Sequence, residues 1–155
     1  MKKIGEYTAR GVVPGANAGA GTPIELNLFD GRFDTGYVVK EFKIWSTDYG
    51  SDAGADCIGK LSKASNGTTA ASEFFRADDD NEIAWATSEG ASQSGNDAGF
   101  GDAILDPNNL VIEDLYVYAR SGTSDDINYM ITMEKYSFSE WRGALAMAVD
   151  AADGE

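Results

Sequence analysis

LVIEDLYVYA (residues 110–119) and the following INYMITME (residues 127–134) decide the fold class. In the second segment Ile127, Tyr129, Ile131 and Met133 alternate with residues 128, 130, 132 and 134, which is the period of a strand with one buried face. The first segment carries large residues on both faces, as a strand covered on both sides does. The connection SGTSDD (residues 121–126) has hairpin chemistry, so we expect two adjacent antiparallel strands.

The same period of two continues along the chain, which 18 glycines and 3 prolines divide into short extended pieces. Expected strands are 6–10, 23–29, 37–46, 56–63, 72–76, 82–87, 110–120 and 127–136. Residues 88–101 are poor in apolar side chains and read as a long surface loop. The pattern predicts a mainly β, single-domain antiparallel β-sandwich, jelly-roll-like, over residues 23–155.

Both ends of the chain carry their own signals. Residues 1–22 are expected to form an N-terminal strand and a flexible arm, because residues 11–21 (GVVPGANAGAG) have few charges and few large side chains. Ser137 and Glu140 fit a capping box, and Trp141 and Leu145 begin a helical repeat. We therefore expect one C-terminal helix at about 138–151.

Composition excludes several kinds of chemistry. The chain of 155 residues has 26 acidic and 12 basic side chains, a formal charge of -14 and no histidine. Catalysis by Ser-His-Asp or Cys-His and histidine metal sites are therefore excluded. Cys57 is the single cysteine, so no internal disulfide can form. Dispersed acidity repels phosphate backbones and is typical of proteins from saline or marine settings.

Targeting and membrane signals are weak. No apolar run approaches the ~20 residues that span a bilayer, so no transmembrane segment is expected. Lys2 and Lys3 precede no apolar stretch, so we expect no secretory signal peptide. No cofactor motif is present, and we expect none to bind.

The acidic run DDDNE (residues 78–82) is the candidate cation site. Asp78, Asp80 and Glu82 offer the hard oxygens that calcium prefers, but the run lacks the spacing and glycine of an EF-hand loop. A solvated turn is the favoured interpretation. Asp30 and Asp34 flank a turn for which cation binding, pairing with Arg32 and a plain polar connection between strands are all open, and the functional interpretations are the less favoured ones.

Three aromatic side chains form the candidate ligand-binding set. Trp45 and Tyr49 lie at the end of one expected strand and Trp85 lies in another. Exposed together they would make a platform for sugar rings, whereas buried they would fill the core, which is the favoured interpretation. Cys57 is expected to be buried and unreactive.

A resemblance to a family rests on segments and not on an active-site motif. LFDGRF (28–33), EIAWA (82–86), DPNNLVIEDLYVY (106–118), NYMITME (128–134) and WRGALAM (141–147) resemble small virion proteins of marine microbial viruses. The resemblance implies a capsid-type β-sandwich that works by self-association, with no catalytic residues to carry over.

The expected function is that of a structural virion protein, a capsid, vertex or decoration subunit, and not of an enzyme. We expect a homo-oligomer that also contacts other virion proteins and is assembled in the host cytoplasm. Only Lys2 and Lys3 make the arm basic, so direct binding of nucleic acid is not expected. The alternative is a soluble β-sandwich ligand-binding module, for carbohydrate, that uses Trp45, Tyr49 or Trp85. A hydrolase with two catalytic carboxylates is a third hypothesis.

Overall fold

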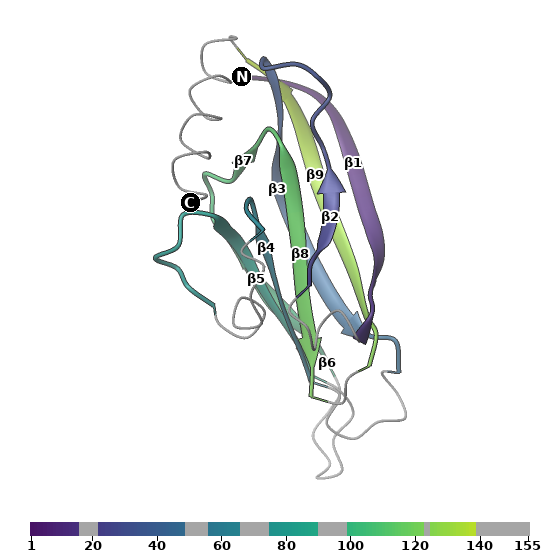
Figure 1. Cartoon of the computed structure of the whole chain (residues 1–155). Coiled ribbons are helices and arrows are strands. Elements are labelled where there is room, and N and C mark those ends of the chain that lie inside the picture. Colours follow the sequence, from purple (N-terminus) through teal and green to yellow (C-terminus); the bar gives the residue numbers. More distant parts are fainter. Residues whose placement is uncertain (16–21, 49–55, 66–74, 90–98, 123–124, 139–155) are drawn as a thin grey trace.

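The computed structural model describes residues 1–15, 22–48, 56–65, 75–89, 99–122 and 125–138. The elements named in these residues are nine β-strands (Figure 1). Their bounds are β1 Lys2–Val13, β2 Ile24–Asn27, β3 Thr35–Ser46, β4 Cys57–Ser62, β5 Glu82–Glu89, β6 Gly99–Leu105, β7 Leu110–Val111, β8 Asp114–Ser121 and β9 Ile127–Ser137. The expected mainly β class is confirmed. The expected helix at 138–151 lies almost wholly outside the described residues.

The strands form two antiparallel sheets. One has the order β1-β9-β3-β7 and the other the order β2-β8-β4-β5-β6. When β6 is set aside, the remaining eight strands are paired from the outside of the sequence inwards: β1 with β9, β2 with β8, β3 with β7 and β4 with β5. This nested pairing brings β1 beside β9, the last strand of the described residues.

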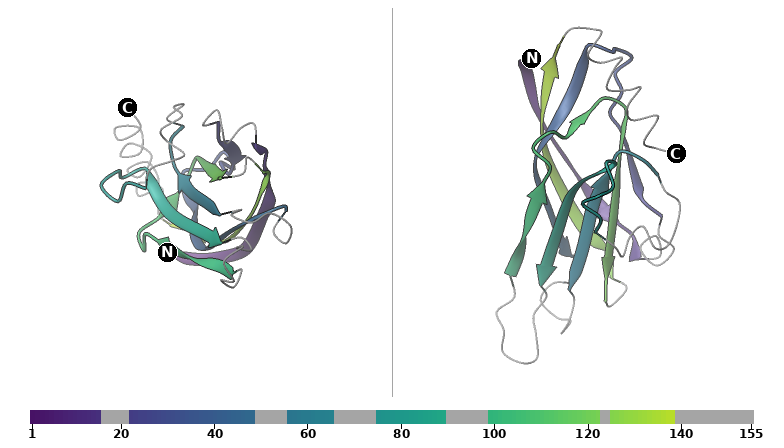
Figure 2. Two further views of the ribbon diagram at one scale, coloured as in Figure 1. Left: turned by 90° about the horizontal axis from the view of Figure 1, so that it is seen from below. Right: turned by 90° about the vertical axis from the view of Figure 1, so that its left-hand side faces the viewer.

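The two sheets share one hydrophobic core, and the strands enclose it when the molecule is seen end-on (Figure 2). Strand β9 shows how the sequence pattern builds it. Ile127, Tyr129, Ile131 and Met133 face the interior and are at most 5% exposed, as the alternation predicts. Phe42 and Ile44 of β3 and Leu115 and Val117 of β8 meet them there.

The expected hairpin of the strands at 110–120 and 127–136 is wrong. The first of these divides: β7 pairs with β3 in one sheet, whereas β8 pairs with β2 and β4 in the other. Strand β9 then lies between β1 and β3, not beside β8. The turn-forming residues at 121–126 predict only that the chain reverses its direction. Such a reversal occurs in a hairpin and also where the chain passes from one sheet to the other.

Other boundaries also differ from those expected. Strand β1 continues to Val13, which is fully buried, so residues 11–13 of the expected arm belong to a strand. Strand β6 begins inside the expected loop at 88–101 and pairs with β5. Phe75 and Arg76, at the end of the expected strand 72–76, lie outside any strand, and residues 72–74 lie outside the described residues.

Candidate functional site

The aromatic side chains proposed as one platform lie on two different sheets. Trp45 is on β3 of the four-stranded sheet and Trp85 is on β5 of the five-stranded sheet. Both are half-buried. Tyr49 lies outside the described residues. The structure therefore does not bring Trp45 and Trp85 together.

Trp45 lies on the outer face of its sheet, in a small grid of side chains. The register pairs Val12 with Asn128 and Asn128 with Trp45 across β1, β9 and β3. The next row on the same face consists of Arg10, Met130 and Lys43. Directly opposed residues of antiparallel strands project to the same side. Because Tyr129 and Ile131 point into the core, both rows point to solvent.

A surface hollow of about 450 Å³ lies over this grid. Its described lining comes from β1 (Arg10, Gly11, Val12), β3 (Trp45) and β9 (Asn128, Tyr129, Met130). Trp45 was a candidate ligand-binding residue only in the alternative hypothesis from the sequence, which favoured a core role for it, and Arg10, Asn128 and Met130 were not candidates. They come from strands far apart in the chain, and only the pairing of β9 with β1 and β3 assembles them.

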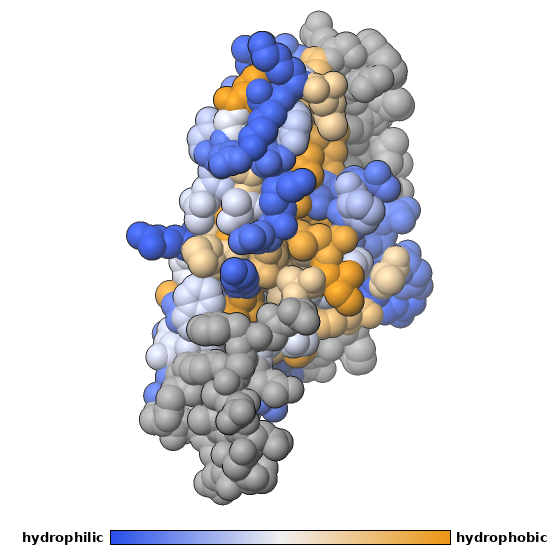
Figure 3. Space-filling view, turned by 180° about the vertical axis from the view of Figure 1, so that it is seen from behind, coloured by the Kyte–Doolittle hydropathy of each residue, from blue (hydrophilic) through white to orange (hydrophobic). Residues whose placement is uncertain are grey.

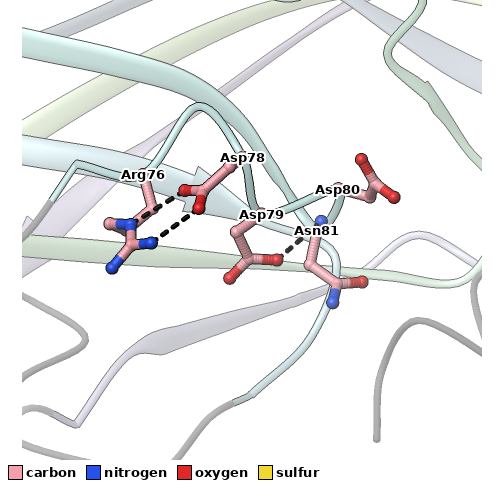
Figure 4. A pocket seen from close by; sticks show the side chains of 5 residues that line it. All are labelled: Arg76, Asp78, Asp79, Asp80 and Asn81. Atoms are coloured by element: carbon pink, nitrogen blue, oxygen red, sulfur yellow. Dashed lines mark hydrogen bonds and ion pairs between the residues drawn. The ribbon is translucent and has the colours of Figure 1, made fainter.

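The acidic run leads into a different hollow, of about 410 Å³, lined by Arg76, Asp78, Asp79, Asp80 and Asn81 (Figure 4). Asp78 accepts two hydrogen bonds from the Arg76 guanidinium, at 2.8 and 2.6 Å. This contact lowers the pKa of the Asp78 carboxyl. Asp79 Oδ1 accepts the backbone N–H of Asn81 at 3.0 Å.

Glu82, the third candidate cation ligand, is turned away from this hollow into a buried ion pair. The Lys60 ammonium lies 3.1 Å from Glu82 Oε1, and both side chains are at most 3% exposed. The carboxylate also accepts the indole N–H of Trp85 at 3.2 Å. Asp78, Asp80 and Glu82 are therefore not brought together as one ligand set. In the described parts of the chain, no group of three or more His, Cys, Asp or Glu side chains is placed to hold a metal ion.

The turn at residues 30–34 is held by its own charges. Arg32 donates two hydrogen bonds to Asp34, at 2.8 and 2.7 Å, so of the alternatives left open by the sequence it is the pairing with Arg32 that the structure contains. Asp30 accepts from the Lys135 ammonium at 2.7 Å and from the Thr35 hydroxyl. These bonds, led by that of Lys135, lower the pKa of the Asp30 carboxyl. Gly31 supplies the turn with its left-handed backbone, at φ 84°.

Cys57 is buried in the core, as expected. Burial, with the nearby charges of Asp125 and Asp56, raises the pKa of its thiol to about 11. The thiolate is the nucleophilic form, so this cysteine is unreactive at neutral pH.

Strand β1 is an edge of the four-stranded sheet and, at 12 residues, is as long as any strand of the described structure. Ile4, Tyr7 and Val12 on it are 42–50% exposed. Its pairing with β9 is in continuous register from Gly5 to Val13. More generally, apolar and hydrophilic residues lie side by side on the face of the molecule seen in Figure 3. An exposed strand edge offers unpaired backbone groups to another chain.

Comparisons with protein-family models, with curated proteins and with solved structures find nothing that matches this chain. In the described residues, no helix has the length and apolar character needed to cross a membrane. The assignment of a function therefore rests on the geometry of this chain alone.

Proposed function

We propose that this chain is a non-enzymatic structural protein that acts by self-association, as a capsid, vertex or decoration subunit of a virion. The long edge strand β1 is the observation that carries the proposal. In an assembly, a second copy adds its own strand to this edge, so that backbone hydrogen bonds join the subunits.

The fold we propose is a jelly-roll-like β-sandwich with one extra strand, β6. A jelly roll has eight strands in two sheets, and its strands pair first with last, second with seventh, third with sixth and fourth with fifth. The pairing of the eight strands other than β6 supports this assignment. Capsid and lectin domains both use this architecture, so the fold alone does not decide between them.

The net negative charge of the chain limits which positions in a virion the subunit can occupy. A formal charge of -14 keeps free subunits soluble and repels phosphate. Packaging of a genome by direct contact needs cations in numbers that this chain lacks. A vertex or decoration subunit, or a shell subunit whose inner surface is covered by another virion protein, fits this charge.

The test is the mass of the protein in solution, measured by sedimentation and light scattering and followed by electron microscopy. We expect assemblies well above the 16.5 kDa of one chain. Tyr7→Pro and Thr8→Pro form a matched pair, because successive N–H groups of a strand point to opposite edges. One of the two N–H groups is bonded to β9, and its replacement by proline removes that bond and lowers the thermal stability. The other N–H group lies at the free edge of β1, and its replacement removes a donor from that edge without loss of thermal stability.

The variant that keeps its thermal stability is expected to be a monomer. A wild-type protein that is monomeric up to millimolar concentration would overturn the proposal, as would a thermally stable proline variant that assembles normally. Deletion of residues 1–13 is a poorer test, because it removes Val13 from the core and exposes the edge of β9.

A further inference from the structure

The hollow beside Trp45 differs in charge from the hollows at residues 76–81 and 31–34. Carboxylates line both of the latter. The described residues that line the hollow beside Trp45 include Arg10 and no Asp or Glu. In a chain with a formal charge of -14, such a place favours an anionic or neutral ligand over a cation.

Arg10 is available to a ligand. Its side chain is exposed, and in the part of the chain that the structure describes it has no carboxylate partner. Lys43, which lies across Met130 from Arg10, is 3.8 Å from Glu41, and both side chains of that pair are more than half exposed. The charges of that pair cancel, so Arg10 supplies the positive charge at this hollow.

The grid offers three kinds of recognition within one hollow. The indole of Trp45 lines the hollow, and an aromatic ring is the kind of surface that packs against the C–H face of a sugar ring. The Asn128 side chain provides an amide donor and an acceptor for neighbouring hydroxyls. The Arg10 guanidinium is a planar fork that matches a carboxylate with two parallel hydrogen bonds. A volume of about 450 Å³ lies in the range of small-ligand sites.

We propose that this hollow binds an acidic sugar residue, a hexuronate, within a polysaccharide. Trp45 stacks on the ring, Arg10 pairs with the carboxylate and Asn128 binds ring hydroxyls. The inference goes beyond self-association: the hollow uses side chains on the face of the sheet, whereas assembly uses the backbone at the edge of β1. A subunit that has both this hollow and the free edge of β1 attaches an assembly to an acidic glycan.

The experiment is a titration of the full chain with trigalacturonate, and with cellotriose as a neutral sugar, followed by calorimetry and backbone amide shifts. We expect the uronate to bind more tightly than the neutral sugar and to shift the amides around Asn128. Trp45→Ala should weaken binding of both sugars about tenfold or more. Arg10→Gln should weaken only the uronate, by about tenfold, since it removes one charge-assisted contact.

Trp85→Phe is the matched control, because Trp85 lies on the other sheet, and it should bind like the wild type. Circular dichroism establishes that each variant is folded, and Trp45→Phe, which keeps an aromatic face, is expected to retain part of the affinity. The proposal is overturned if the wild type binds neither sugar at 10 mM ligand (about -2.7 kcal/mol). It is also overturned if Trp45→Ala binds normally or if Arg10→Gln keeps the preference for the uronate.

Discussion

The Lys60 ammonium and the Glu82 carboxylate form an ion pair 3.1 Å long between neighbouring strands of the five-stranded sheet, and both side chains are almost completely buried. Lys60 also lies over the ring of Tyr118, with 5.6 Å between Nζ and the ring centroid. The register aligns Lys60 with Tyr118 on one side and with Trp85 on the other. This polar group therefore lies within an aromatic row that crosses β8, β4 and β5.

Breaking this pair on one side should be costly. Lys60→Met leaves the Glu82 charge buried, which costs about 3–5 kcal/mol of unfolding free energy. Lys60→Met/Glu82→Gln removes both charges, so we expect it to cost less than the sum of the single variants. Urea denaturation measures both. Lys43→Met, which breaks an exposed pair, is the control and should cost less than about 1 kcal/mol. A loss below 1 kcal/mol in Lys60→Met would contradict the expectation.

Asp30 should make stability depend on pH in the acidic range. Its folded-state pKa lies below the usual value, mainly because the Lys135 ammonium donates a hydrogen bond to it. The resulting stability is fully present above the usual pKa near 4 and is lost as the pH falls through the lower, folded-state pKa. Asp30→Asn should therefore lower the melting temperature at pH 7, and its difference from the wild type should vanish in strong acid. Asp80→Asn, at an exposed position, is the control; a deficit of Asp30→Asn that is equal at pH 7 and pH 2 would refute this assignment.

Strands could be predicted from the sequence both where one face is buried, as in β9, and where nearly every residue is buried, as in β4. Strands β3, β4 and β9 were expected at 37–46, 56–63 and 127–136 and lie within two residues of those bounds. Strand β6 was missed because its sequence, GFGDAIL, carries few large side chains and its Ile104 is 69% exposed. Its pairing with β5, not its own pattern, makes it a strand.

Sheet membership and the candidate site depend on contacts between distant residues. The pairing of β9 with β1 places Asn128 opposite Val12, and the sequence around either residue does not indicate this contact. Trp45 was a candidate because of its residue type alone. Arg10 and Met130 are ordinary strand residues in the sequence and gain a role only from the register.

Removal of a carboxyl group at residue 25 should stabilise the protein. The pKa of Glu25 is raised, first by a side-chain hydrogen bond with Asp114 on the neighbouring strand, so the charged form is disfavoured in the fold. A raised carboxyl pKa costs stability above the usual pKa, and that cost disappears as the pH falls and Glu25 is protonated. Glu25→Gln should raise the melting temperature at pH 7 and leave it unchanged at pH 3. Glu113→Gln, also exposed, corrects for the general loss of one negative charge. An equal gain in both variants would show that the gain comes from the lower net charge and not from the contact between Glu25 and Asp114.

Gly59 sets how closely the two sheets approach one another. A Cβ at this position would lie 3.0 Å from Ile44 Cδ1, on the opposite sheet, and 3.2 Å from the Tyr118 carbonyl oxygen. Gly59→Ala should therefore destabilise the fold by about 1–3 kcal/mol through overpacking. Ile44→Val alone should cost about 0.5–1.5 kcal/mol, because it removes a buried methyl group.

Since that methyl group is the nearest atom to the new Cβ, Gly59→Ala/Ile44→Val should cost less than the sum of the two single variants. Chemical denaturation of all four proteins measures the coupling. Ile83→Val, another buried isoleucine in the same core, replaces Ile44→Val in a control cycle and should be additive with Gly59→Ala. Additivity in the Ile44 cycle would mean that the sheets separate around the alanine, and Gly59 would then not limit their approach.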